Sequence, residues 1–333
     1  MPEPIAELAE VQAFREQVAQ GTAPAVLRGG AGHWKSVAAG ADGADAIERY
    51  LRRKDSGTPV YTIVGSPPMQ GRFGFSADTR SVNYGARQTP LSSALAHFPE
   101  AARGGFSVAV QAARARAVLS DWEAENRNTL APADAEPTVW ISMKSSVAPH
   151  ADVHDNVAVV VAGSRRFTLF PPEHIKNLYL GPLLSSPGGV PTSSVNFREP
   201  DRRAHPRFAQ AERDALAATL MPGDTIFIPA LWWHGVESLE SFNVLVNFWF
   251  GGNRHDLSPS DAMAHAILAI GSLPRHQRAR WRRYFEHLVF RLDENPAEHL
   301  PGDLEDLLSQ PNDEQVGRLL NDIGQKLIAK YRD

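Results

Sequence analysis

The stretch SSVAPHADVHDNVAVVVAGSRRFTLFPP, residues 145–172, decides how this 333-residue chain is organised. It offers His150 and Asp152 two residues apart, then an apolar run, then paired arginines and a Phe-Pro-Pro stop. Side chains two residues apart on a strand point to the same face. If the segment is extended, His150 and Asp152 lie side by side, as two ligands of a metal site would.

Short β-type runs separated by Gly and Pro surround this stretch. Few helices of ten or more residues stand between them, which favours a sandwich or barrel over βαβ units. We therefore predict an all-β core in residues 105–252, interrupted by a mostly looped insertion over about 173–223 with a short helix before Leu220. The predicted strands are 106–111, 138–143, 157–163, 165–170, 224–229 and 243–250.

The regions on either side of the core have other patterns. Residues 1–104 are predicted to form an α+β region that packs on the barrel, and residues 67–84 are predicted as a loop near a pocket. The expected elements are a helix over about 4–20 that ends at Gly21, a strand over 25–29, a helix over 45–53 and a strand over 59–64.

Residues 253–333 form a predicted helical extension. Ser258 to Asp261 supplies an N-cap, a first-turn proline and an acidic third position, which together mark a helix start. Apolar stripes at helical spacing follow over 281–292 and 316–327. These two amphipathic helices either pack on their own barrel or cover each other in a homodimer, and the pattern does not choose between the two arrangements.

Composition excludes several classes of site and partner. The chain has no cysteine, so disulfides, thiolate metal sites and cysteine nucleophiles are absent. Its formal charge of −4 gives no electrostatic footprint for nucleic acid. The N-terminus does not resemble a signal peptide, and no window approaches the roughly 18 apolar residues of a membrane span. A cytoplasmic location is the expectation.

A third candidate ligand, His234, stands near the end of PGDTIFIPALWWHGVES. Two His and one carboxylate on one side of a metal form the facial triad of non-heme Fe(II) oxygenases, which leaves coordination positions open. His150, Asp152 and His234 fit this arrangement. His-x-Asp alone is weak evidence in a chain with twelve histidines, and His154 and Asp155 are rival ligands in the same stretch.

The chain resembles the cupin-like, Jumonji-C-related 2-oxoglutarate and Fe(II) dependent oxygenases, the branch that includes the asparaginyl hydroxylase of the hypoxia pathway. The blocks that carry the resemblance are HADVHDN at 150–156, GSRRFTLFPP at 163–172, NLYLGP at 177–182, GDTIFIPALWWH at 223–234 and NVLVNFWF at 243–250. The fold implied by the resemblance is a double-stranded β-helix, a squashed jelly-roll barrel with a metal at its open mouth.

The resemblance also implies roles for individual residues. Fe(II) would be held by His150, Asp152 and His234. Asn156 and Asn247 fall where the family places polar groups that line the 2-oxoglutarate pocket. Arg165 falls where the family often has the basic residue that pairs with the distal carboxylate, and an Arg can hold a carboxylate by two parallel hydrogen bonds.

Two positions depart from the family pattern. Val147 stands where a Thr is common, and Ala109 stands where a Tyr on an earlier strand helps to bind 2-oxoglutarate. The co-substrate pocket is therefore partly rebuilt. Either Lys144 or a nearby serine such as Ser146 fills the gap, or a different 2-oxo acid is used.

The function implied by the resemblance is that of a 2-oxoglutarate-dependent dioxygenase that hydroxylates a C–H bond, with Fe(II), 2-oxoglutarate and O2. The expected substrate is a protein or peptide side chain, with a small molecule as the other option. Demethylation of an N-methyl group is a variant of the same chemistry. Two different functions would suit the same barrel: that of a non-catalytic cupin-type protein that binds a metal or small molecule, and that of a zinc-dependent isomerase that would use His154.

Overall fold

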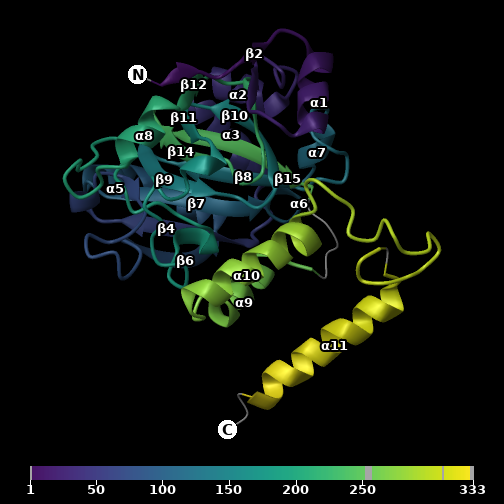
Figure 1. Ribbon diagram of the computed structural model, residues 1–333. Helices are drawn as coiled ribbons and strands as arrows, with labels where there is room; N and C mark the ends of the chain where they lie inside the picture. The colour runs from purple at the N-terminus through teal and green to yellow at the C-terminus, as the bar shows by residue number, and fades with distance from the viewer. Residues whose placement is uncertain (1, 252–256, 310, 331–333) are drawn as a thin grey trace. The chain divides into compact units, whose positions relative to one another are not determined.

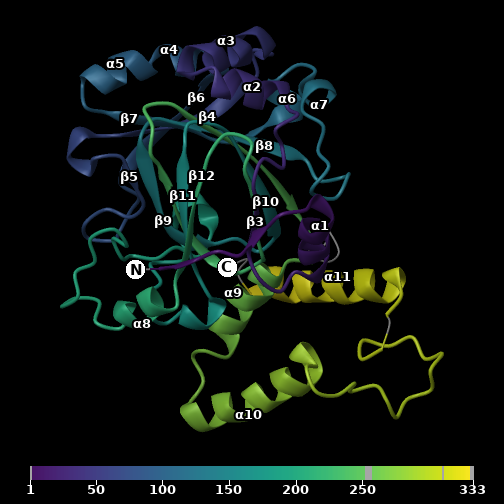
Figure 2. The same cartoon turned by 90° about the horizontal axis from the view of Figure 1, so that it is seen from above.

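Two β-sheets lie face to face in the computed structural model of the protein (Figures 1 and 2). The structure describes residues 2–251, 257–309 and 311–330. The strands are β1 (Glu3–Pro4), β2 (Glu7–Leu8), β3 (Ala25–Leu27), β4 (Pro59–Gly65), β5 (Arg72–Phe73), β6 (Tyr84–Pro90), β7 (Ser107–Arg114), β8 (Pro137–Ser142), β9 (Ser145–Ala151), β10 (Asp155–Ala162), β11 (Arg165–Phe170), β12 (Leu216–Leu220), β13 (Thr225–Ile228), β14 (Trp233–Ser238) and β15 (Asn243–Phe250).

The larger sheet has the order β2-β3-β13-β10-β15-β8-β7-β4-β6, and the smaller has the order β1-β12-β11-β14-β9-β5. From β8 to β15, every connection except that from β11 to β12 crosses from one sheet to the other. This crossing pattern defines a jelly roll. The predicted all-β cupin core is therefore confirmed.

Helices cover the outer face of the larger sheet. Figure 2 shows α2 to α5 beside its strands, and Trp34, Ile47 and Leu95 pack with Val159 and Val161 of β10 in one hydrophobic cluster. The helices of this part of the chain are α1 (Val11–Gln20), α2 (Lys35–Ala41), α3 (Ala44–Lys54), α4 (Leu91–Ala96), α5 (Phe98–Arg103), α6 (Ala115–Val118), α7 (Trp122–Glu125) and α8 (Phe208–Arg213), with short 3-10 turns η1 (Pro67–Met69), η2 (Pro172–His174) and η3 (Pro187–Gly189).

Strand β10 is apolar on both of its faces. Val159 and Val161 pack against the helical layer, whereas Ala158 and Val160 pack toward the smaller sheet together with Phe167. A strand that is covered on both sides has no polar face, which explains why its sequence is a continuous apolar run. The central strand of the core is thus visible in the stretch 145–172.

Several expected elements need correction. The N-terminal helix begins at Val11 rather than near residue 4, because the short strands β1 and β2 pair in parallel with β12 and β3. Its predicted end is confirmed, since Gly21 adopts a left-handed φ of 64° and its N–H reaches the Gln17 carbonyl. The short helix expected before Leu220 is present as Phe208–Arg213, but Leu216–Leu220, which the helical spacing included, form a strand that pairs with β11.

The N-terminal region and the barrel lie in one compact unit, residues 1–253, and residues 254–333 form a second. The boundary expected at residue 252 lies outside the described residues. In the second unit, α9 (Pro259–Ala269) begins at Ser258, whose side chain accepts from the Asp261 N–H as predicted. The other elements are α10 (Arg275–Phe285), a π-helical turn η4 (Glu286–Phe290) and α11 (Asp313–Lys330). None of the helices in the described ranges is both long enough and apolar enough to cross a membrane.

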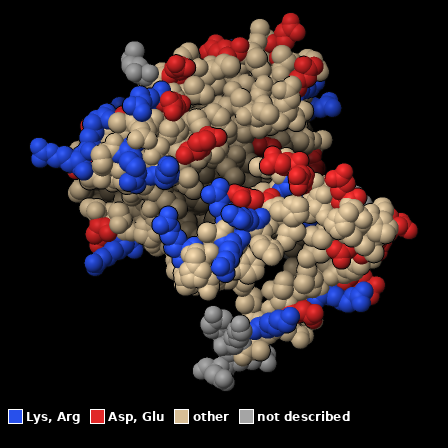
Figure 3. All heavy atoms as spheres, in the orientation of Figure 1, with Lys and Arg blue, Asp and Glu red and all other residues tan. Residues whose placement is uncertain are grey.

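Charged side chains of both signs are spread over the face shown in Figure 3, with Lys and Arg gathered over α8 and over α10. Helix α10 alone carries Arg275, Arg278, Arg280, Arg282 and Arg283. Positive charge is therefore local on a chain whose formal net charge is −4.

The contact between α2 and β10 leads to a stability prediction. A Cβ atom at Gly40 would lie 1.9 Å from the Val161 carbonyl oxygen, so Gly40→Ala forces the helix away from the sheet. We expect the free energy of unfolding to fall by about 3 kcal/mol, measured by denaturant titration. The control is Gly85→Ala in β6, where the added methyl group meets open space. An equal effect of both substitutions would contradict the packing argument.

Candidate metal centre and active site

Neighbouring strands of the smaller sheet bring the two candidate histidines together. His150 on β9 lies directly opposite His234 on β14, and Val147 lies opposite Val236. Three residue steps on β9 thus match two on β14, so β9 contains a bulge between Val147 and His150. A bulge reverses the alternation of side chains and re-aims those that follow it. Val147 and His150 both line the same cavity as a result.

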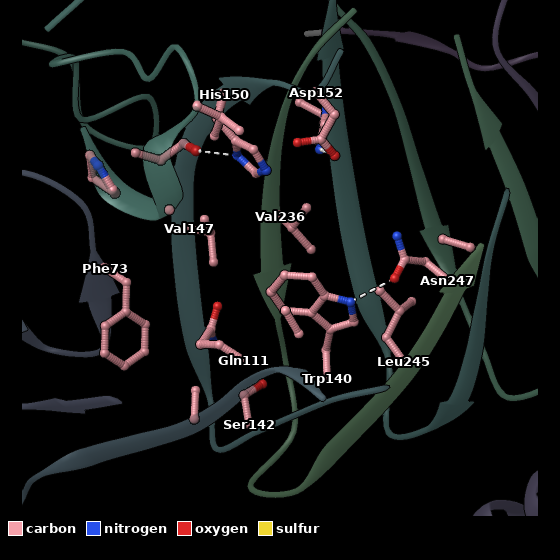
Figure 4. Close-up of a pocket in the computed structure, with 18 of the residues that line it drawn as sticks. Phe73, Gln111, Trp140, Ser142, Val147, His150, Asp152, Val236, Leu245 and Asn247 are labelled. Carbon is pink, nitrogen blue, oxygen red and sulfur yellow. Dashed lines mark hydrogen bonds and ion pairs between the residues drawn. The ribbon is translucent and has the colours of Figure 1, made fainter. Parts of the chain in front are cut away.

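The ligand atoms of His150, Asp152 and His234 all lie within 4.8 Å of one another. The two imidazole rings are 4.2 Å apart between centroids, and His234 Nε2 is 3.7 Å from Asp152 Oδ2. Asp152 is the first residue after β9, and Figure 4 shows its carboxylate facing His150 at one end of the cavity. The residues proposed as ligands from the sequence therefore form one cluster.

Hydrogen bonds fix which nitrogen of each imidazole can bind a metal. Nδ1 of His150 lies 3.0 Å from the Ala148 carbonyl, and Nδ1 of His234 lies 3.1 Å from the Trp232 carbonyl. Because a carbonyl only accepts, each Nδ1 carries the proton and each Nε2 keeps its lone pair. Burial, reinforced by the nearby His150, lowers the pKa of His234 to about 4 and keeps it in the neutral form that binds metals.

Asp152 is held in place from the larger sheet. The indole Nε1–H of Trp249 on β15 donates to Asp152 Oδ2 at 3.0 Å. Trp249 in turn contacts the Trp140 ring edge-on, with 5.8 Å between centroids. Two imidazoles and one oriented carboxylate, all on one side of a cavity, suit a divalent iron ion and leave positions open for other ligands.

The cluster opens into a cavity of about 650 Å³ between the two sheets. On one wall, Trp140 Nε1 donates to Asn247 Oδ1 at 2.7 Å, and Asn247 Nδ2 donates to Asn156 Oδ1 at 3.1 Å. The first of these bonds is drawn in Figure 4. Asn156 and Asn247 thus line the cavity, where the resemblance expects them. The two hydrogen bonds fix the orientation of both amide groups.

Arg165 is a buried cation in the same cavity. Its residue is 6% exposed, its Nε has no hydrogen-bond partner, and its Nη2 donates only to the Trp140 carbonyl at 3.4 Å. No carboxylate pairs with Arg165 within the described ranges, and burial lowers the pKa of its guanidinium to about 9. A buried unpaired charge is costly, so the site favours an anionic ligand that would pair with it.

Two proposed cofactor-binding residues are not brought to the cavity. Lys144 is exposed in the turn between β8 and β9, and Ser146 is buried outside the cavity lining. The reason is strand alternation, which turns Ser145 and Val147 inward and their neighbour away. The rival ligands are also apart from the cluster, since His154 is exposed and an oxygen of Asp155 accepts from the Ala230 N–H.

Sequence reasoning missed part of the lining. Ser142 and Ser238 line the cavity, as do Tyr61 and Tyr84 from the N-terminal region. Small serines in a β-run carry no recognisable motif, and β14 was not predicted as a strand. Side chains alternate between the two faces of a strand, so Ser238, four residues after His234, lies on the same face. This spacing would have predicted that Ser238 lines the cavity.

A jelly roll with a His-x-Asp pair at the end of one strand and a second His on the neighbouring strand is a cupin-type barrel with a metal-binding mouth. A family model for the cupin-like domain matches residues 11–255, and the chain belongs to this family.

Curated relatives match over shorter segments. The chain is 37% identical over 116 residues to HSPB1-associated protein 1 of Homo sapiens, which is 34% of this chain and 23% of that protein. It is 42% identical over 161 residues to tRNA wybutosine-synthesizing protein 5 of Mus musculus, 44% of this chain and 47% of the relative. It is 33% identical over 129 residues to lysine-specific demethylase JMJ31 of Arabidopsis thaliana, 39% and 23% of the respective chains. The chain therefore spans less than half the length of these relatives.

The bond from Trp249 to Asp152 gives a prediction about metal affinity. Trp249→Phe keeps an aromatic ring but removes the N–H, so the carboxylate loses the partner that orients it. We expect Mn(II) to bind about 10-fold more weakly, measured by calorimetric titration. Trp281→Phe on α10 is the control and should leave the affinity unchanged. Equal affinities of wild type and Trp249→Phe would show that this hydrogen bond does not position the ligand.

Proposed function

We propose that the chain is an Fe(II) and 2-oxoglutarate dependent oxygenase that hydroxylates a C–H bond. The observation that carries the proposal is the presence, in one cavity, of the His150, Asp152 and His234 cluster and the buried unpaired Arg165. A dicarboxylic keto acid that chelates a metal at one end and carries a carboxylate at the other would use both features.

Each residue of the site has a definite task in this proposal. His150, Asp152 and His234 would hold the iron, and Trp249 keeps the carboxylate turned toward it. Arg165 would pair with the far carboxylate of 2-oxoglutarate. The bound iron and co-substrate supply the oxidation of a C–H bond by O2, which side chains alone do not perform.

Apolar side chains form much of the wall of the cavity. Phe167, Val236 and Leu245 line it from both sheets, and Trp140 closes the side next to Asn247. Apart from Asp152 and Arg165, the described lining contains no Lys, Arg, Asp or Glu. Once the metal and the co-substrate occupy those two residues, the remaining space suits an uncharged group.

This lining supports an uncharged side chain as the substrate group over a methylated lysine. The names of the relatives concern different substrates, a lysine in one case and a tRNA in another. They do not choose between substrates for this chain. A neutral side chain of a protein or peptide is our proposal because the cavity offers no carboxylate to receive a lysine ammonium group once Asp152 holds the metal.

Self-association through the C-terminal helices is also part of the proposal. Leu319, Ile323 and Leu327 of α11 follow one another at four-residue spacing and are each about two-fifths exposed. An apolar stripe of this kind on a helix favours burial against a partner. We propose that a second copy of the chain covers it.

Sedimentation velocity tests this association. Ile323→Asp places a charge in the stripe and should convert a dimer into a monomer. Asn321→Asp adds the same charge outside the stripe and should leave the dimer intact. A wild-type chain that sediments as a monomer at all concentrations would contradict the proposal.

The proposed activity has a direct spectroscopic test. Addition of Fe(II) and then 2-oxoglutarate without oxygen should produce a visible charge-transfer absorption band, and admission of air should yield succinate. Asp152→Ala removes a ligand and should weaken Fe(II) binding by more than about 100-fold, beyond the loss expected from an outer-shell change. Asp134→Ala, an exposed carboxylate, is the control. Absence of both the band and succinate in the wild type would overturn the assignment.

A further inference from the structure

The buried end of the cavity, opposite the metal cluster, is formed by contacts between the two sheets. Ser142 Oγ on β8 donates to Ser238 Oγ on β14 at 2.9 Å, and Arg165 Nη2 on β11 reaches the Trp140 carbonyl on β8. Figure 4 shows Ser142 at the end of the cavity away from His150. We call Arg165, Ser142, Ser145 and Ser238 the floor of the cavity.

Three of the four floor residues are also neighbours by strand register. Ser238 lies opposite Arg165 across β11 and β14, and opposite Ser145 across β14 and β9. Each is buried and each lines the cavity. The floor is therefore a built polar cluster at the end of an otherwise largely apolar space.

The floor has more hydrogen-bond donors than acceptors within reach of them. A guanidinium has five N–H donors, and in the described ranges those of Arg165 find a single acceptor, the Trp140 carbonyl at 3.4 Å. The serine pair shares one hydrogen bond, so one of its two hydroxyl hydrogens is free to turn toward the cavity. Ser145 Oγ adds a further hydroxyl without a partner in the described ranges. None of the floor residues is acidic. The floor therefore offers hydrogen-bond donors and a positive charge that an anion could bind.

Two cavity-lining positions near the floor carry apolar side chains, although Gln111 also lines the cavity. Val147 and Val236 face each other across β9 and β14, and Ala109 lies opposite Ser142 across β7 and β8. Val147 and Ala109 are the two positions where the resemblance expects hydroxyl groups. The floor serines line the cavity beside these two positions.

We propose that Ser142, Ser145 and Ser238 supply the hydroxyl donors that Val147 and Ala109 lack, and together with Arg165 bind the far carboxylate of a 2-oxo dicarboxylic acid. The inference rests on the proposed function and identifies the residues that select its co-substrate. Hydrogen bonds to a charged group are the strong ones, so these small side chains carry a large share of the selectivity.

Calorimetry on the Mn(II)-loaded protein without oxygen tests the serine pair, because it reports binding and not turnover. Ser238→Ala should weaken 2-oxoglutarate binding by about 10-fold because it removes the hydroxyl that donates to the charged group. Ser142→Ala should have a similar effect because it removes the hydrogen bond that orients this hydroxyl. The double variant should lose little more than either single variant, because the two hydroxyls act as one unit. Mn(II) affinity should not change in any of them.

Two further variants separate a binding role from a folding role. Ser107→Ala removes an equally buried serine that does not line the cavity and should leave binding unchanged. Ser238→Thr keeps the hydroxyl and should retain most of the affinity. Thermal unfolding of every variant shows whether a loss of binding reflects a loss of fold, and the Ser238→Thr result decides the role even if Ser238→Ala unfolds.

A comparison of two keto acids is the second part of the test. Wild type should bind 2-oxoglutarate at least about 10-fold more tightly than 2-oxobutyrate, which has the keto acid group but no second carboxylate. Arg165→Met should lose much of this preference but keep part of it, because the serine hydroxyls still donate to the second carboxylate. That result would show that the floor residues determine the preference for 2-oxoglutarate over 2-oxobutyrate.

The outcomes distinguish the inference from the function on which it rests. If the serine variants bind 2-oxoglutarate as tightly as wild type while Arg165→Met does not, the serine floor is wrong and the oxygenase assignment stands. If Mn(II)-loaded wild type binds no 2-oxoglutarate, both are overturned. Tight binding that depends on the serines and on the second carboxylate supports both.

Discussion

The register between β9 and β14 is the constraint on which the site depends. The bulge between Val147 and His150 lets β9 present Val147 and then His150 to the same cavity, with His150 directly opposite His234. A slip of one residue would turn the histidine away from the cavity. Asp152 follows at the strand end, where Trp249 from the other sheet can hold it. The metal cluster thus stands on the smaller sheet, and a hydrogen bond from the larger sheet holds its carboxylate, so the packing of the jelly roll keeps the parts together.

The second constraint is the charge distribution inside the barrel. The cavity holds a carboxylate at one end and a guanidinium among serines at the other, and the cation has no acidic partner of its own in the described ranges. Pairing Arg165 internally would remove the cost of its burial and also its capacity to bind an anion. Separation of the two charges along a largely apolar space therefore matches a ligand that is anionic at its far end and chelates a metal at its near end.

Much of this arrangement could be predicted from the sequence. The apolar run of β10 and the short runs around it indicated the barrel, and His150, Asp152 and His234 do cluster as expected. Bulges and strand registers escaped prediction because they depend on pairing between distant segments. Lys144 and Ser146 were misplaced for this reason, since a single-residue change of parity decides which side chains face the cavity. The strand β14 was missed because Pro229 and the paired tryptophans obscure its alternation.

A crystal structure of the protein grown without oxygen in the presence of Mn(II) and 2-oxoglutarate tests the central claim most directly. We expect one metal ion bound by Nε2 of His150, by the Asp152 carboxylate and by Nε2 of His234, with the far carboxylate of 2-oxoglutarate on Arg165. A metal held by other residues such as His154, or a 2-oxoglutarate molecule bound away from Arg165, would contradict this account of the site.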